Sequence, residues 1–250
     1  MPGRLRELLT DGKTAFGVWV MLSGPAGAEM IASVEPDYVG IDCQHGLLAY
    51  EGMRDILLAL KGLATTPIVR VPSNDPWWIG KALDAGAEGI IVPLVNSGAD
   101  AERAVAACRF PPDGERSFGL ARGHQPLGRD PAEINKGVLC FPMIETHDGL
   151  DAADQICSTP GVDGIYIGPS DLALSLGLSP VFTDPPAQHA AAVDRIRTAC
   201  EAARIVPGIH AHSGADAHRR AEQGFRMVTV TADASLLAIG SLTELGAARG

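Results

Sequence analysis

The chain has 250 residues, 46% of them hydrophobic, and its 20 Lys and Arg against 30 Asp and Glu give a formal net charge of −10. The hydrophobic fraction and the spread of charge exclude a disordered chain, and the 29 Gly and 18 Pro follow no short period, which excludes a collagen-like or low-complexity one. The acidic balance leaves no basic stripe for phosphates, so we expect no nucleic-acid partner.

Eight short apolar runs alternate with segments of helical spacing along the chain. They predict strands at 16–21, 38–42, 68–71, 89–92, 138–144, 164–167, 206–211 and 227–230. Ala-rich segments with interspersed charges predict helices at 50–61, 76–85, 98–108, 189–203 and 215–223. Because the runs are apolar throughout and do not alternate with polar residues, they are typical of parallel strands covered on both faces.

Eight such units in 250 residues predict one domain over residues 1–250, an α/β protein folded as a (β/α)8 TIM barrel. A doubly wound sheet is the alternative, but it usually carries a GxGxxG turn after an early strand, and the sequence has none. Two longer connections, 110–136 and 174–188, are expected to be functional or ordered by their neighbours.

The N-terminal segment lacks the apolar stretch of a signal peptide, and no run of about 18 apolar residues occurs, so we expect no membrane span. The five cysteines are odd in number and form no CxxC pair. They indicate reduced, mostly buried thiols of a cytoplasmic protein, in place of a disulfide framework or a zinc site.

In a barrel of this kind the active site lies at the carboxyl ends of the strands. Polar or aromatic residues stand near the predicted ends of most strands: Trp19, Asp42, Gln44, His45, Arg70, Glu145, Ser170, Asp171, His210, His212 and Asp233. Charged groups are seldom buried without a partner, so this set indicates chemistry at the mouth of the barrel.

Glu145 and Asp171 follow the fifth and sixth predicted strands. Two carboxylates with water in the other positions suit an octahedral Mg²⁺ or Mn²⁺. The alternative is a pair of exposed acids that cap helices, and Asp171 precedes a Leu-Ala-Leu stretch as an N-cap would.

His45 stands three residues after Asp42, and a carboxylate beside an imidazole fixes its tautomer and raises its basicity, as a general base requires. A loop histidine bonded to backbone is the alternative. Arg70 lies inside an apolar strand and needs an anionic partner. That partner is Asp42 or Glu145 in a structural role, or a substrate oxyanion in a functional one.

Together these motifs resemble the HpcH/HpaI aldolase family, the class II (metal-dependent) pyruvate aldolases, which include 4-hydroxy-2-oxoheptanedioate and 2-keto-3-deoxy sugar acid aldolases. The matching pieces run in family order over about residues 14 to 235, at 17–19, 38–46, 67–72, 83–87, 92–93, 110–116, 144–146 and 160–172. The resemblance implies a modified TIM barrel of the phosphoenolpyruvate/pyruvate type. It also implies a homohexamer, a trimer of dimers, whose C-terminal helices are exchanged between subunits.

The resemblance further implies a divalent Mg²⁺, Mn²⁺ or Co²⁺ held by Glu145 and Asp171 and chelated by pyruvate through its carboxylate and keto oxygens. Arg70 would contact the keto oxygen and stabilise the enolate. His45, oriented by Asp42, would serve as the acid and base.

By the same resemblance, the backbone N–H groups of Ser170 and Asp171 would hold the pyruvate carboxylate, and Trp19 would line the pocket. Asp84 matches a family acid that reaches toward a neighbouring subunit's site. Arg122 and His124 lie in a loop that in the family can close over the site, which suggests contact with a substrate carboxylate.

The chain departs from the family pattern at three positions. Gln44 stands where the family usually has Glu, Met143 where it often has Gln, and His210 where an apolar residue commonly lines the pocket. These changes call into question the usual diacid or sugar-acid substrates, because His210 adds a titratable group where the acceptor part of the substrate should lie. The alternative for His210 and His212 is a pair of loop histidines bonded to backbone.

The resemblance implies a carbon–carbon lyase that reversibly cleaves a 4-hydroxy-2-oxo acid to pyruvate, or a related 2-oxo acid, and an aldehyde. A metal and Arg70 would offset the charge of the enolate, and Lys61, Lys81 and Lys136 fall in helices or loops, which argues against a Schiff-base mechanism. The alternatives are an oxaloacetate decarboxylase or a biosynthetic aldol enzyme using the same enolate, a CoA-thioester lyase of the citryl or malyl type, and a barrel retained as a binding or structural subunit.

Overall fold

The computed structural model of the chain describes residues 4–22, 24–119, 128–180 and 185–250. Eight parallel strands form a closed barrel in which each strand pairs with its neighbours in sequence and β8 pairs with β1. The strands are β1 (Ala15–Val20), β2 (Tyr38–Asp42), β3 (Thr66–Arg70), β4 (Gly89–Val92), β5 (Leu139–Ile144), β6 (Gly164–Ile167), β7 (Val206–His210) and β8 (Met227–Ala232). The predicted (β/α)8 barrel is confirmed.

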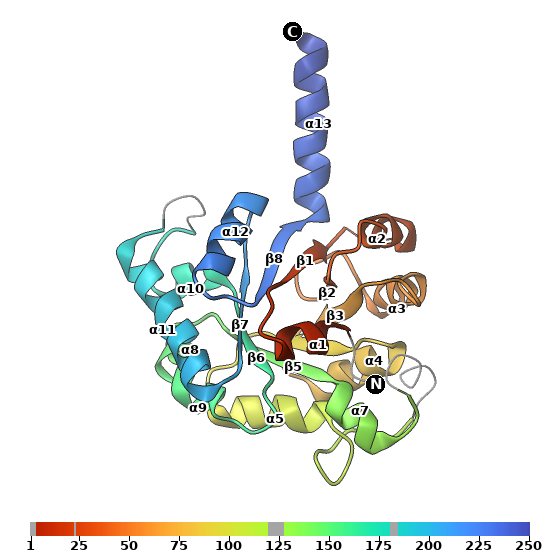
Figure 1. The fold of residues 1–250 in the computed structure, drawn as a ribbon, viewed down its shortest axis with the longest axis vertical. Coiled ribbons are helices and arrows are strands. Elements are labelled where there is room, and N and C mark those ends of the chain that lie inside the picture. Colours follow the sequence, from red (N-terminus) through yellow and green to blue (C-terminus); the bar gives the residue numbers. More distant parts are fainter. Residues whose placement is uncertain (1–3, 23, 120–127, 181–184) are drawn as a thin grey trace.

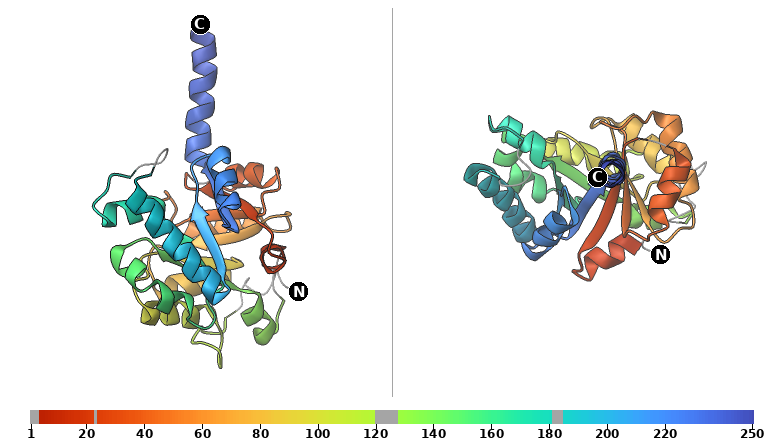
Figure 2. Two further views of the ribbon diagram at one scale, coloured as in Figure 1. Left: turned by 60° about the vertical axis from the view of Figure 1, so that its left-hand side comes forward. Right: turned by 90° about the horizontal axis from the view of Figure 1, so that it is seen from above.

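Helices surround this barrel and connect its strands, as Figures 1 and 2 show. They are α1 (Arg4–Thr10), α2 (Pro25–Ala32), α3 (Tyr50–Ala59), α4 (Pro76–Ala85), α5 (Gly98–Cys108), α7 (Pro131–Gly137), α8 (His147–Asp151), α9 (Ala153–Cys157), α10 (Pro169–Ser175), α11 (Ala187–Ala203), α12 (Gly214–Glu222) and α13 (Asp233–Arg249). Among these helices none has both the length and the apolarity needed to cross a membrane.

Short polar side chains start several helices just after a strand ends. Asp75 accepts a hydrogen bond from the backbone of α4, Ser97 from α5, Thr146 from α8 and Ser213 from α12. Such caps each contribute about 1 kcal/mol, because they satisfy a backbone N–H that has no partner inside the helix. They fix the short distance between strand end and helix start, where the polar residues of the mouth stand.

Two layers of apolar side chains pack against the strands. One lies between strands and helices, and its buried members include the cysteines of α5, β5, α9 and α11. The other fills the inside of the barrel with Leu5, Ala15, Trp19, Tyr38, Ile68, Ile91, Leu139, Phe141, Met143, Tyr166, Met227 and Ala232. Leu5 of α1 is fully buried in this inner layer, and its backbone N–H donates to Thr66 Oγ1.

Glycines in the strands make room for the large rings of the inner layer. A Cβ on Gly17 would lie 2.3 Å from the ring of Tyr38, and one on Gly40 would lie 2.2 Å from the ring of Trp19. The strand glycines therefore set where the aromatic rings stand inside the barrel.

Helix α13 differs from the other helices because it packs against little of its own chain. It begins directly after β8 and extends away from the body of the molecule (Figure 1). None of its residues is buried. The large apolar side chains exposed on it are Leu236, Leu237, Ile239, Leu242 and Leu245.

We predict that Gly17→Ala lowers the free energy of unfolding by about 1–3 kcal/mol, because the added methyl group overpacks the ring of Tyr38. Urea denaturation measures the change. Gly27→Ala is the control, since a Cβ at this position of α2 meets nothing within 4 Å, and it should stabilise the fold by up to about 1 kcal/mol. A Gly17→Ala protein as stable as the wild type would contradict the packing described for the inner layer.

Candidate active site

A cavity of about 200 Å³ opens at the carboxyl ends of the strands. Its lining residues come from several strands and the turns after them: Trp19, Met21, His45, Arg70, Met143, Tyr166, Gly168, Pro169, Ser170, Asp171, His210 and His212. The structure thus brings together Trp19, His45, Arg70, Ser170, Asp171 and His210, which the sequence predicts as site residues, and Asp42 and Glu145 adjoin the lining through the contacts given below.

Asp42 and Arg70 form a buried, bidentate ion pair beside the cavity. They are register partners on the adjacent strands β2 and β3. Arg70 donates from Nε to Asp42 Oδ1 at 2.9 Å and from Nη2 to Oδ2 at 2.6 Å. Burial alone would raise the pKa of Asp42, but hydrogen bonds and charge from Arg70 outweigh it and, with two backbone N–H groups, hold that pKa below its usual range. The anionic partner that Arg70 requires is therefore Asp42.

The same carboxylate positions the turn that carries His45. Asp42 Oδ1 accepts the backbone N–H groups of Gln44 at 3.0 Å and of His45 at 3.2 Å. The predicted contact was between the Asp42 carboxylate and the imidazole of His45. In the part of the chain that the structure describes, Asp42 instead contacts His45 through the backbone, and the side-chain partner of its carboxylate is the Arg70 guanidinium.

Glycine is required where this turn ends. A Cβ on Gly46 would lie 2.2 Å from the carbonyl oxygen of Asp42 and 3.0 Å from that of Met21. The turn is thus packed tightly against the strand end, and it holds Gln44 with its side-chain Oε1 buried and without a hydrogen-bond partner among the described residues.

Glu145 is a buried carboxylate with one oxygen unused. It follows β5, is 1% exposed, and its Oε1 accepts the backbone N–H of Leu94 at 2.8 Å. Its Oε2 is buried and has no hydrogen-bond partner among the described residues. Burial, together with repulsion from Asp171, raises the pKa of Glu145 to about 7, although Leu94 and Arg70 act in the opposite direction.

Gly168 makes the space for this carboxylate. A Cβ at Gly168 would lie 2.4 Å from Glu145 Oε2 and 3.1 Å from the terminal methyl of Met143. Gly168 is also the residue before α10, so Asp171 stands in the first turn of that helix. The turn Gly168–Pro169 therefore brings the second carboxylate toward the first.

The carboxylates of Glu145 and Asp171 fit a divalent cation. Glu145 has an unused buried oxygen, and the Asp171 carboxylate is close enough to raise the pKa of Glu145. A bound cation would offset this repulsion between the two carboxylates. In the described part of the chain no group of three or more His, Cys, Asp or Glu side chains could hold a metal. Two protein oxygens suit Mg²⁺ or Mn²⁺, which keep several positions for water and substrate.

Aromatic rings form another wall of the cavity. Trp19 stacks on Tyr166 with ring centroids 5.5 Å apart and meets the edge of His210 at 5.4 Å. The Arg70 guanidinium carbon lies 5.3 Å from the centre of the Trp19 ring. Tyr166 Oη lies 3.2 Å from His210 Nδ1, so the His210 side chain bonds to a side chain, in contrast to the backbone-bonded alternative.

His210 is held uncharged by its surroundings. Burial, with His212 and Arg70 nearby, lowers the pKa of His210 to about 3, although Asp42 acts against this. Burial also lowers the pKa of His212, whose backbone N–H donates to Asp216. The imidazole of His210 is therefore neutral at physiological pH.

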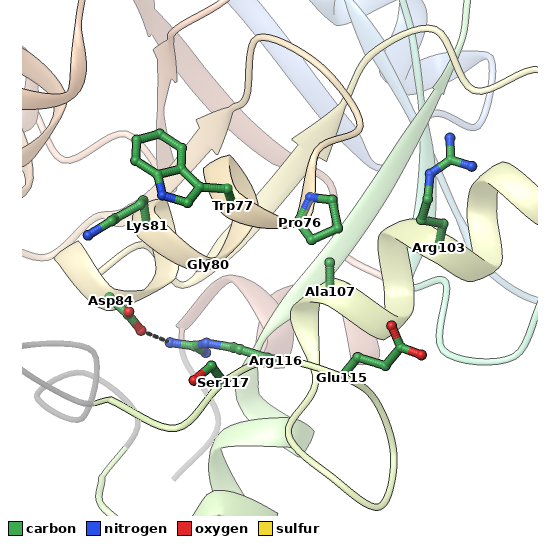
Figure 3. Close-up of a pocket in the computed structure, with 10 residues that line it drawn as sticks. All are labelled: Pro76, Trp77, Gly80, Lys81, Asp84, Arg103, Ala107, Glu115, Arg116 and Ser117. Atoms are coloured by element: carbon green, nitrogen blue, oxygen red, sulfur yellow. Dashed lines mark hydrogen bonds and ion pairs between the residues drawn. The ribbon is translucent and has the colours of Figure 1, made fainter.

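Asp84 lies away from this cavity. It is on α4 and accepts a hydrogen bond from Arg116 at 2.7 Å, at a second cavity of about 340 Å³ between α4, α5 and residues 115–117 (Figure 3). Within one chain the structure does not bring Asp84 to the other predicted residues. Arg122 and His124 lie outside the described residues.

Sequence reasoning assigned no role to three features of the site. Tyr166 lies within the 160–172 motif but reads as one more apolar strand residue. Gly168 lies in the same motif, where the Gly-Pro step before a helix was its only signal. The backbone N–H of Leu94 donates to Glu145 because Leu94 adopts a left-handed conformation with φ of 54°. Nothing in the residue types around Leu94 predicts this conformation.

A closed parallel barrel with two carboxylates and a buried Arg–Asp pair at the carboxyl ends of its strands defines a (β/α)8-barrel enzyme. The family model described as HpcH/HpaI aldolase/citrate lyase matches residues 15–239, and the chain belongs to this family. It is an aldolase, a carbon–carbon lyase.

Relatives resemble this chain over nearly all of its length. It is 36% identical to a hydroxypyruvate/pyruvate aldolase of Rhizorhabdus wittichii, over 98% of both chains. It is 34% identical to a 5-keto-4-deoxy-D-glucarate aldolase of Escherichia coli, over 93% of this chain and 91% of that one. The crystal structure of an HpcH/HpaI aldolase/citrate lyase family protein from Burkholderia cenocepacia matches with a TM-score of 0.91 and 32% identity, over 98% and 99% of the two chains.

We predict that Asp42→Asn lowers the free energy of unfolding by about 3–5 kcal/mol, because it leaves the Arg70 guanidinium buried without its counter-charge. The pKa of Asp42 is lowered in the folded state, so its stabilisation is fully present above the unfolded pKa of about 3.9 and is lost as pH falls through the folded value. The difference between the two proteins should therefore shrink below about pH 4. Urea denaturation from pH 3 to 7 measures both effects.

A double-mutant cycle provides the control. Asp42→Asn with Arg70→Met removes both charges, so its loss of stability should be smaller than the sum of the two single losses. Additive losses would contradict the coupling of the two side chains.

Proposed function

We propose that this aldolase binds a divalent metal ion and reversibly cleaves a 4-hydroxy-2-oxo acid to an aldehyde and pyruvate or a related 2-oxo acid. The observation that carries the proposal is the unused oxygen of Glu145 next to Asp171, in a site that also holds a buried arginine. The names of the two aldolase relatives support the same chemistry.

In the cleavage direction the reaction needs one proton removed and one returned. The hydroxyl on C4 loses its proton, the C3–C4 bond breaks, and C4 becomes the carbonyl carbon of the aldehyde. The electron pair of the broken bond moves to C3 and is delocalised onto the keto oxygen as an enolate. A proton delivered to C3 completes the 2-oxo acid. The site must therefore stabilise charge at the keto oxygen and exchange a proton near C4.

Arg70 is suited to the first task. Asp42 occupies one edge of its guanidinium through Nε and Nη2, so Nη1 and the second proton of Nη2 are the donors left for an oxyanion. Because Asp42 fixes the guanidinium beforehand, Arg70 stabilises the enolate without reorganising during the reaction. Glu145 and Asp171 would hold Mg²⁺, Mn²⁺ or Co²⁺, which supplies a Lewis acid for the 2-oxo acid when bound.

His45 is the group that we assign to the proton. It lines the cavity on the turn that Asp42 fixes through the backbone, and imidazole exchanges protons near neutral pH. The first N–H groups of α10, those of Ser170 and Asp171, have no partner within the helix and would bind the carboxylate of the 2-oxo acid. Trp19 packs beside Arg70 and closes the wall of the pocket.

We predict that wild-type protein exchanges the C3 protons of pyruvate with D2O, that a chelator stops this exchange, and that added Mn²⁺ restores it. Glu145→Gln keeps the shape of the side chain but removes its charge, so Mn²⁺ affinity should fall at least about tenfold and exchange should be lost. Electron paramagnetic resonance of free Mn²⁺ and proton NMR of pyruvate measure the two effects.

Glu88→Gln is the matched control. Burial also raises the pKa of Glu88 to about 7, but Glu88 precedes β4 and so lies at the opposite end of the barrel. The Mn²⁺ affinity of the Glu88→Gln protein should equal that of the wild type. Exchange that survives chelation would contradict metal dependence, and CO2 release from oxaloacetate without any aldol cleavage would indicate a decarboxylase.

We also propose that the chain assembles into a homohexamer, a trimer of dimers, with α13 packed on a second copy. A helix with large apolar side chains distributed around it is normally buried, whereas α13 is exposed along its whole length. In such an assembly Asp84, which faces away from its own site, would reach the site of a neighbouring subunit. The resemblance to the family and the position of Asp84 in the second cavity support this assignment.

We predict that Leu237→Asp with Leu242→Asp shifts the protein to a smaller species in analytical ultracentrifugation, because charge cannot be buried at an apolar contact. Gly240→Asp with Ala247→Asp places the same charge in the widest gap between the large apolar side chains of α13 and should retain more of the assembly. Equal dissociation by the two double variants would contradict a contact made by the leucines.

A further inference from the structure

His189 is a buried histidine that the reaction proposed above does not use. It stands in the first turn of α11 and is 2% exposed. Its Nε2 lies 2.8 Å from the carbonyl oxygen of Pro169. Because a carbonyl oxygen only accepts, Nε2 carries a proton and donates it to this hydrogen bond. The other ring nitrogen, Nδ1, is buried and has no hydrogen-bond partner among the described residues.

The imidazole of His189 carries a cost that its hydrogen bond to Pro169 must justify. A buried polar atom without a partner, such as Nδ1, loses the hydrogen bonds that water gives it in the unfolded chain. An apolar side chain of similar size would fill the same space without that loss. What the imidazole adds at this position is therefore a hydrogen bond from α11 to Pro169.

Pro169 is the residue through which this hydrogen bond reaches the candidate site. It is the first residue of α10, lines the cavity and comes two residues before Asp171. The residue before it, Gly168, packs against the other carboxylate, since a Cβ there would lie 2.4 Å from Glu145 Oε2. A shift of Pro169 would therefore move Asp171 relative to Glu145.

Helix α10 is too short to hold its position by itself. It has 7 residues, and isolated helices shorter than about 12 residues are marginal in water. Hydrogen bonds tie both of its ends to other helices. At the first turn Pro169 accepts the bond from His189. At the last turn Ser175 Oγ accepts the backbone N–H of His147 at 2.8 Å, so the bond from His189 is the one close to Asp171.

Helix α11 gives the donor a firm support. It has 17 residues, packs against β6 and β7, and lies beside α10 (Figure 1). Val193 and Ile196, on the same helix as His189, are buried in the layer between strands and helices. The position of the Nε2 donor is therefore fixed by the barrel and does not depend on α10.

The hydrogen bond opposes a repulsion within the site. The carboxylate of Asp171 is close enough to act on that of Glu145, and like charges repel. Without a cation this repulsion pushes the first turn of α10 away from Glu145, whereas His189 holds that turn in place. A site whose carboxylates are already held together binds a cation more tightly than one whose carboxylates must first be brought together.

We propose that His189 is a positioning residue of the metal site, which through its hydrogen bond to Pro169 holds the first turn of α10 where Asp171 and Glu145 share one divalent cation. This inference rests on the proposed function. His189 raises the affinity for the cation and exchanges no proton with the substrate. At saturating metal the two carboxylates are held together by the cation they share, so loss of the hydrogen bond should then matter little.

Two amide side chains separate this hydrogen bond from the polarity of the position. In His189→Gln the amide nitrogen is as many bonds from the backbone as Nε2 of histidine, so it can donate to Pro169. In His189→Asn the amide nitrogen is one bond closer to the backbone and falls short. We expect Mn²⁺ affinity, measured by electron paramagnetic resonance of free Mn²⁺, to fall about tenfold in His189→Asn and to stay close to the wild-type value in His189→Gln.

Ser175→Ala is the control on the same helix. It removes the hydrogen bond at the other end of α10, from an exposed residue, and Mn²⁺ affinity should remain near that of the wild type. Urea denaturation of the metal-free proteins measures the structural effect of each change separately. At saturating Mn²⁺ the exchange of pyruvate protons should approach the wild-type rate in both His189 variants, a recovery that loss of a catalytic group would not show.

Nitrogen-15 NMR tests the wild type without any variant. His189 should carry a proton on Nε2 near neutral pH, and addition of Mg²⁺ should shift the signal of that proton, because the hydrogen bond adjoins the site. A ring without a proton on Nε2, or a signal that Mg²⁺ leaves unchanged, would overturn the proposal.

Failure of this inference can be separated from failure of the proposed function. If the wild type exchanges pyruvate protons with Mn²⁺, the role of His189 alone is overturned by unchanged Mn²⁺ affinity in His189→Asn, by equal losses in the two His189 variants, by an equal loss in Ser175→Ala, or by exchange that stays low at saturating Mn²⁺. Wild-type protein that shows no metal-dependent exchange overturns the proposed function and this inference with it.

Discussion

The buried ion pair of Asp42 and Arg70 is the interaction on which the rest of the site depends. A carboxylate and a guanidinium out of water stabilise the fold only while both are present. Here the carboxylate also accepts two backbone N–H groups of the turn after β2, and the guanidinium lies beside Trp19. One interaction therefore joins two adjacent strands, holds the turn that carries His45 and orients the Arg70 guanidinium. The register of β2 and β3 thus determines where these side chains of the site stand.

Much of the fold could be predicted because its strands are mostly apolar and do not alternate with polar residues, a pattern typical of parallel strands covered on both faces. Residue-level boundaries agree to within about two residues, as for β3, which begins at Thr66 where the apolar run begins at Ile68. The residue pattern alone did not predict the path of α13, and only the resemblance implied a C-terminal helix exchanged between subunits. Whether an apolar helix packs on its own barrel depends on contacts that spacing along one chain does not record.

The members of the site could be predicted better than their bonds. Residues at strand ends must meet, so Arg70, Glu145 and Asp171 follow from the topology. The partner of a charged group is less certain, because it depends on the register of the strands. The sequence argument left Asp42, Glu145 or a substrate oxyanion open as the partner of Arg70, and the structure pairs Arg70 with Asp42. Gly168 leaves room for the Glu145 carboxylate, and the backbone N–H of Leu94 donates a hydrogen bond to it. Residue types alone do not reveal either contact.

The contact between Tyr166 and His210 has a consequence for how this enzyme can change over generations. Tyr38 and Thr229 belong to the packing of the barrel, yet Thr229 bonds to the hydroxyl of Tyr166, which lines the cavity. A substitution deep among the strands, such as Thr229→Val, would keep the size of the side chain and would still deprive two buried tyrosine hydroxyls of that partner. Selection can therefore act on residues inside the barrel, because a change there reaches the wall of the cavity while the lining residues stay the same.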